Sequence, residues 1–438
     1  MPAKLSAEIM GKSGHDIISL EMHYPWLFQP GLVDVSDICN DLSRKHGDWY
    51  TFAKEHALVK GSGSAFRTCT PRSRAVTGSI CSEKIGEREP DTWDDLLRAG
   101  RKLKKLGHPV GFAISQTTDS VSTLYSILWS YGAKDVAEDG KTIAINSKQT
   151  EAVIDYVQAL YTDAMDPAVL SWDNAGNNQW LNSGKGSWIH NPISHYVVAK
   201  QEKLAVAELT GFHPSPAGPA GRHTVGVPRS LGFWKFSKNV DVARDFMKWF
   251  FEPAQYQEWI MSGDSYNHPT WRDMENHPVW DVDKKYKPIK GMAKYSHLYG
   301  WPAPPDEKIQ LITNSYIIPQ HVRARGHQRL EAQGGDALGR DRDQAGLRTG
   351  LVSGTTHEGV AWLLILAAMA MGCGLTVKDK GSVTSTSAAS CSSIPIGFLR
   401  PTATGTKTVT RATTRPGDRP GPHPHAGAPP DTRRAMPA

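Results

Sequence analysis

Two polar clusters in the sequence combine residue types that bind hydroxyl-rich ligands. The first, WDNAGNNQW, runs from Trp172 to Trp180. Its carboxylate and amides offer hydrogen-bond donors and acceptors, and an indole offers a flat apolar face for the carbon side of a sugar ring. This mixture favours a carbohydrate ligand. The alternative is a polar loop in which Trp180 anchors the next helix.

The second cluster surrounds His190 in the stretch GSWIHNP, residues 186–192. The apolar residues before His190 predict a strand, and Asn191 and Pro192 end it. Open α/β sheets place ligand groups at such strand ends. We interpret His190 as a hydrogen-bonding group in a pocket, and a core histidine satisfied by backbone groups is the alternative. Trp301, which lies among prolines, is either a stacking platform or a plug in a loop.

Motifs of the common enzyme classes are absent from the sequence. It contains no nucleophile elbow, no phosphate-binding P-loop, no His-Glu-x-x-His and no dinucleotide-binding glycine fingerprint. Asp281-Val282-Asp283 lacks the further ligands of a calcium loop and is interpreted as a solvated turn. We therefore expect a binding protein that is not an enzyme and has no cofactor or metal. A secreted carbohydrate-active enzyme is the alternative, although no carboxylate pair stands out.

The amino-acid composition excludes further functional classes. The chain has 438 residues, a net charge of +6 and 44 acidic residues, which is not the charge distribution of a nucleic-acid-binding protein. Its five cysteines show none of the short paired spacings of zinc or redox sites, so we interpret them as structural or adventitious thiols. A hydrophobic content of 39% is ordinary for a soluble protein with two or three domains.

The hydrophobic pattern from Thr92 to Pro319 alternates between helices and short strands, which is typical of an α/β protein. A helix capped by Asp91 or Thr92 is predicted first, followed by a strand over residues 110–114. Further helices are predicted over residues 120–131 and 147–164, and two more over residues 240–259, separated at Pro253.

This pattern ends at Gln320, after which Arg, Gly, Thr and Pro dominate and a largely disordered tail is predicted. Within it, Val360 to Val377 is an uncharged apolar run that meets the minimum length of a membrane span. A segment translated out of frame is the alternative. Residues 62–88 also lack any period. The N-terminus shows no secretory signal in the chain as given.

Several stretches resemble one known family. PDTWDD (90–95), GKGSWI (184–189), SKN (237–239), SYNHP (265–269), GWP (300–302) and IIP (317–319) follow one another in the family's order. SGHDII (13–18) and GLVD (31–34) add to them. Together they resemble the extracellular solute-binding proteins of ABC importers, family 1, the sugar-binding class that includes maltose-binding protein. The resemblance covers most of residues 10–60 and 89–320.

The resemblance implies a two-lobed α/β fold, the periplasmic-binding-protein fold, in which a hinge closes the lobes on a solute. We assign residues 1–61 and 224–296 to a partial first lobe and residues 89–223 and 297–320 to the second lobe. Residues 62–88 are assigned to an irregular crossover region. Residues 321–438 form the low-complexity tail with its apolar run, 360–377.

The resemblance also implies which residues bind the solute. Three would line the first lobe's side of the cleft, five the second lobe's side, two would lie near the hinge strands and two at the rim. They are His23, Tyr24 and Trp26; Gln116, Trp172, Asn177, His190 and Asn191; Gly232 and Phe233; Tyr266 and Trp301. The implied partners are a carbohydrate or related solute and a membrane permease. The protein is expected to be a periplasmic monomer that does not bind nucleic acid.

The sequence departs from the family in its first strand and helix, in its crossover strands and after Pro319. Frameshifts near Ser62 and Gln320 would explain the two internal breaks. We therefore expect a truncated and frameshifted member with an incomplete first lobe. Because a missing strand leaves sheet edges unpaired, weak or no ligand binding is expected.

Overall fold

The computed structural model describes residues 2–59, 62–63, 66–71, 76–78, 85–263, 266–268, 270–326, 375–378 and 382–385. The chain divides into two compact units, Met1–Met371 and Gly372–Ala438. Among its described residues the first unit contains two four-stranded sheets with their helices, and all candidate site residues lie in it.

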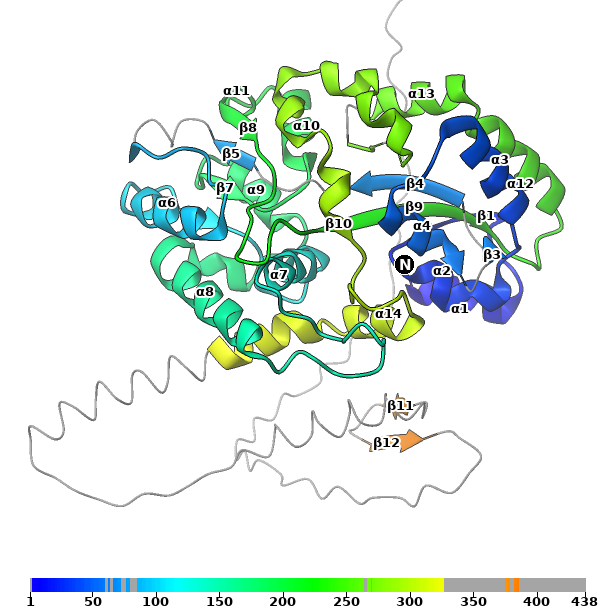
Figure 1. Ribbon diagram of the computed structural model, residues 1–438, viewed down its shortest axis with the longest axis horizontal. Coiled ribbons are helices and arrows are strands. Elements are labelled where there is room, and N and C mark those ends of the chain that lie inside the picture. Colours follow the sequence, from blue (N-terminus) through cyan, green and yellow to red (C-terminus); the bar gives the residue numbers. More distant parts are fainter. Residues whose placement is uncertain are drawn as a thin grey trace, which may run out of the picture. The chain divides into compact units, whose positions relative to one another are not determined.

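The first sheet is organised around β9 (Thr224–Phe233), a ten-residue strand that is buried along almost its whole length. It pairs antiparallel with β1 (Ile17–Glu21) and β4 (Phe66–Pro71), and parallel with β10 (Ser296–His297) (Figure 1). Neighbouring strands cover both edges of β9 along much of its length, so many of its backbone groups are paired within the sheet. The accompanying helices are α1 (Pro2–Gly11), α2 (Tyr24–Phe28), α3 (Ser36–His46), α4 (Thr51–Ala57), α12 (Val240–Phe250) and α13 (Pro253–Ser262).

The second sheet has the strand order β6 (Val110–Gly111), β7 (Trp188–Ile189), β5 (Val76–Gly78) and β8 (Thr210–Phe212). β6 and β7 are parallel, whereas β5 is antiparallel to both β7 and β8. The helices of this part are α6 (Trp93–Lys105), α7 (Thr118–Ser130), α8 (Lys148–Ala164), α9 (Gly176–Asn182), α10 (Ser194–Gln201) and α11 (Val206–Leu209). In Figure 1, α6 and α8 lie side by side.

Short elements fill the connections. They are β2 (Leu58–Val59), β3 (Ser62–Gly63), α14 (Glu307–Asn314) and six short 3-10 helices: Gln29–Gly31, Pro167–Leu170, Arg272–Asn276, Pro278–Asp281, Lys284–Ile289 and Met292–Tyr295.

The predicted helices are confirmed, and their starts have the expected chemistry. Thr92 caps α6 in a capping box: its hydroxyl accepts the Asp95 N–H, and the Asp95 carboxylate accepts the Thr92 N–H. Ser147 caps α8 by accepting the Thr150 N–H. Pro253 begins α13, where the missing N–H costs nothing.

The segment over residues 62–88, expected to be irregular, contains strands. β4 continues the first sheet along β9, with Phe66 opposite Leu231 and Pro71 opposite Gly226. β5 lies in the second sheet between β7 and β8. The chain therefore passes from the first sheet to the second after β4 and returns after β8. Backbone pairing with neighbouring strands, which needs no side-chain period, explains why the local sequence did not reveal it.

The stretch assigned to the second lobe after residue 297 contacts both parts. Gln310 of α14 accepts the backbone N–H of His23, and Asn314 accepts the Tyr24 hydroxyl. The Tyr299 hydroxyl lies 2.7 Å from the Ser122 hydroxyl of α7. Residues 317–326 are helical, so ordered structure continues beyond Gln320, where the sequence pattern was expected to end.

In the second unit, β11 (Leu375–Lys378) pairs antiparallel with β12 (Ser382–Ser385), although no strand was expected in the tail. Residues 360–374 of the apolar run lie outside the described residues, and the remainder of the run belongs to β11. Among the residues that the structure describes, no helix has the length and apolar character to cross a membrane.

Candidate functional site

A network of amides lies beyond the ends of β6 and β7. Asn177 on α9 is buried, and its Nδ2 donates to the Asp119 carboxylate of α7 over 2.9 Å. The next residue, Asn178, donates to the Ser194 hydroxyl at the start of α10 over 3.1 Å. Asn191 donates to the same hydroxyl over 3.2 Å and to the Asn178 side-chain oxygen. The structure thus brings the predicted Asn177 and Asn191 into one network.

Two tryptophans pack beside this network. Trp172 and Trp180 are both buried, with ring centroids 5.0 Å apart and planes tilted by 51°. Gly111 at the end of β6 makes room for them, because a Cβ there would lie 2.7 Å from the Trp172 ring. The Trp172 carbonyl accepts the Ser115 hydroxyl, and Gln116 in the same loop is exposed. Among the predicted site residues of this paragraph, Gln116 is therefore the one whose side chain is exposed and can contact a solute.

His190 lies in the core of the second sheet. Its side chain is fully buried, with Nδ1 3.0 Å from the Thr123 hydroxyl and Nε2 3.0 Å from the Ser215 hydroxyl. The ring stacks on Trp188 and meets the edge of Trp93. This position favours the interpretation of a core histidine, although hydroxyl groups satisfy it where backbone groups were expected.

The residues predicted for the first lobe are also held by internal contacts. His23 is fully buried, its Nε2 lies 3.1 Å from the Tyr299 carbonyl, and burial lowers its pKa to about 4. Burial raises the pKa of Tyr24 to about 12. Trp26 is partly exposed and donates to the Glu55 carbonyl over 3.1 Å. Of these three side chains, Trp26 presents the most surface.

Gly232 and Phe233 lie at the C-terminal end of β9. The chain crosses from the second sheet to the first at the other end of this strand. The strand enters from the second sheet at Thr224, whereas Phe233 pairs with Ile17 and is fully buried. Nine residues of extended strand separate the two ends, a distance of about 30 Å. The chain crosses from the second sheet before Thr224, and the expectation that Gly232 and Phe233 lie near the hinge strands stays a prediction.

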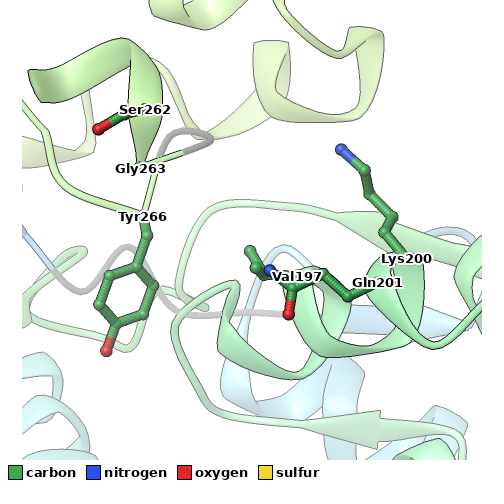
Figure 2. Close-up of a pocket in the computed structure, with 6 residues that line it drawn as sticks. All are labelled: Val197, Lys200, Gln201, Ser262, Gly263 and Tyr266. Carbon is green, nitrogen blue, oxygen red and sulfur yellow. The ribbon is translucent and has the colours of Figure 1, made fainter. Parts of the chain in front are cut away.

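A cavity of about 480 Å³ lies between α10 and the segment that follows α13. Figure 2 shows three residues of α10 opposite three residues at and beyond the end of α13. The predicted residue Tyr266 is one of them. The lining residues are Val197, Lys200, Gln201, Ser262, Gly263 and Tyr266.

Helix α10 connects the amide network with this cavity. Ser194, its first residue, bonds to the amides, and Val197 and Lys200 face the cavity within the next two turns. The Lys200 ammonium lies 3.9 Å from the Asp283 carboxylate. The sequence analysis did not predict these α10 residues. A helix that begins directly after Asn191-Pro192 was the feature that could have indicated them.

Trp301 lies away from this cavity and belongs to an aromatic cluster at the crossing. Its ring stacks on His297 at 3.9 Å between centroids. Among the described parts of the chain, no group of three or more His, Cys, Asp or Glu side chains is arranged to hold a metal ion. The arrangement as a whole offers hydrogen-bonding groups and aromatic surface.

Comparison with known proteins supports the resemblance inferred from sequence. Residues 70–257 match the family model described as "Bacterial extracellular solute-binding protein". The match includes residues 70–88, within the segment expected to be irregular. A comparison with curated proteins finds no significant match.

Solved structures share the fold. A maltose-bound MalE3 of T. maritima has a TM-score of 0.66 at 18% identity, covering 75% of this chain and 83% of that one. A sugar transporter from Arthrobacter chlorophenolicus with bound laminaribiose has a TM-score of 0.63 at 14% identity, with 79% and 89% covered. A solute-binding protein from Agrobacterium radiobacter in complex with ribitol has a TM-score of 0.63 at 16% identity, with 74% and 84% covered. The predicted two-lobed fold is confirmed.

Proposed function

Since residues 70–257 match the family of bacterial extracellular solute-binding proteins, we propose that the chain is the substrate-binding component of an ABC importer, capturing a sugar or sugar-like solute between its two lobes. The family match carries this proposal. It is supported by the fold that the chain shares with proteins bound to maltose, laminaribiose and ribitol.

The chemistry of the candidate site fits a hydroxyl-rich solute. In this proposal three side chains meet the solute: the exposed Gln116 from the loop before α7, and the partly exposed Trp26 from α2 and Tyr266 from the segment after α13. The buried amides Asn177 and Asn191 hold the loop ends in place, because their own hydrogen bonds are made within the protein. Tyr266 supplies an aromatic ring for the apolar side of a sugar.

The lobe boundaries belong to the same proposal. The first lobe comprises residues 1–61 and 224–296, and the second residues 89–223 and 297–320, with the segment after residue 297 contacting both. Closure then rotates one sheet against the other about the segments that connect them, and the closed form is presented to a membrane permease. We propose that the protein meets the permease in the periplasm and that it binds its solute as a monomer.

Calorimetric titration tests the proposal. Maltose, laminaribiose and ribitol, each titrated into the full chain, are expected to include at least one that binds with micromolar affinity. Tyr266→Ala should weaken that binding, whereas Tyr266→Phe, which keeps the ring, should retain it. Absence of binding by the folded chain to all three solutes would contradict the proposal and match the weak binding expected from the sequence.

The same samples separate capture from catalysis. The binding role predicts that the bound solute is recovered unchanged after prolonged incubation, as judged by chromatography. Hydrolysis of laminaribiose or maltose by the purified chain, abolished by substituting one carboxylate, would favour a carbohydrate-active enzyme.

A further inference from the structure

Two histidines meet at the crossing between the sheets, outside the candidate solute site. His223 directly precedes β9 and His297 ends β10. The parallel pairing of β10 with β9 sets Ser296 beside Thr224 and His297 beside Val225, which brings the two imidazoles together. The His223 Nδ1 lies 2.9 Å from the His297 Nε2.

The second nitrogen of His223 fixes its tautomer. Nε2 lies 3.4 Å from the Ala220 carbonyl oxygen, which can only accept a hydrogen bond. Nε2 therefore carries the proton, and Nδ1 presents a lone pair toward His297. Metal-binding histidines are typically oriented in this way, by donating their other ring N–H to a carbonyl or carboxylate.

Aromatic rings hold His297 on its other sides. Trp301 stacks on it with planes 17° apart, and Trp129 of α7 meets it edge-on at 5.6 Å. Burial lowers the pKa of His297 to about 3 and also lowers the pKa of His223. Both imidazoles are consequently neutral at pH 7, the form that binds metal, and both keep part of their surface exposed.

We propose that His223 and His297 form a two-imidazole site for a divalent transition-metal cation, with Cu(II) bound most tightly. Metal–imidazole bonds are about 2.0 to 2.1 Å long, so two nitrogens bound at a right angle lie about 2.9 Å apart. Imidazole suits Cu(II), Ni(II) and Zn(II), and Cu(II) leads in affinity.

The two nitrogens point at each other in the hydrogen bond, with ring centroids 5.1 Å apart, so metal binding requires a rotation of the rings and a tautomer change but no net proton release. The cation takes the lone pair of His223 Nδ1 and a lone pair on His297 Nε2. The proton that leaves His297 Nε2 is replaced by one from solvent on Nδ1, so both ligands remain neutral. Water completes the coordination, since no third His, Cys, Asp or Glu of the described residues joins the pair.

The test is a Cu(II) titration of the full chain at pH 7, followed by calorimetry and electron paramagnetic resonance. One Cu(II) with two imidazole nitrogens is expected, together with quenching of tryptophan fluorescence, because Trp301 contacts His297. His223→Gln, at a partly exposed position, should weaken this Cu(II) at least tenfold. His108→Gln, at an exposed histidine, is the matched control and should leave it unchanged.

The tail histidines His423 and His425 provide the competing explanation. If a double variant of these two abolishes the Cu(II) signal while His223→Gln leaves it intact, the proposal is overturned. Circular dichroism of His223→Gln excludes loss by misfolding.

Discussion

Replacing His190 tests whether this residue supports the fold or contacts the solute. The change His190→Phe keeps an aromatic ring of similar size between Trp93 and Trp188 but removes the bonds to the Thr123 and Ser215 hydroxyls. Each hydrogen bond contributes about 1 kcal/mol net, and a buried hydroxyl that loses its partner costs about 1 to 3 kcal/mol. We expect the free energy of unfolding to fall by about 2 to 4 kcal/mol.

Urea denaturation followed by tryptophan fluorescence measures this loss. His190→Gln, which retains one hydrogen-bonding end, is the graded control and should lose roughly half as much. Solute affinity, determined by calorimetry on folded protein, should be unchanged in both variants. The reasoning is refuted if His190→Phe keeps its stability but loses solute binding, because His190 would then be a ligand group.

Three further predictions follow from burial and packing. Gly111→Ala should destabilise the protein by about 1 to 3 kcal/mol in urea denaturation, because the added Cβ meets Trp172 at 2.7 Å; Gly11→Ala, with open space, should have little effect. Stability should decline as the pH falls from 6.5 toward 4, because unfolded His23 takes up a proton that the buried side chain, with a pKa of about 4, refuses. At about 1.4 kcal/mol per pH unit, the free energy of unfolding should fall by about 3 kcal/mol between pH 6.5 and pH 4. In His23→Gln the free energy of unfolding should depend less on pH. Tyr266→Ala should weaken solute binding about tenfold with unchanged stability, since its ring lines a cavity; an equal loss in Tyr266→Phe would assign the effect to the hydroxyl.

The sequence alone predicted α6, α7, α8, α12 and α13, and it showed a resemblance to one family. Local signals sufficed for α6, because the Thr92–Asp95 capping box and the apolar face of the helix are both encoded within a few residues. The same holds for α12 and α13, which Pro253 separates. Ordered short motifs were enough to infer the resemblance, because several of them lie at a helix start or a strand, as residues 90–95 and 184–189 do.

The tertiary structure decided what local patterns do not encode. β4 and β5 exist through pairing with strands more than 100 residues away, so their own sequence need not show a period. The role of His190 depended on whether hydroxyls from α7 and the loop after β8 surround it. The His223–His297 contact arises from the register of β10 on β9. Residue type and local order follow from the sequence, whereas burial and partners depend on long-range packing.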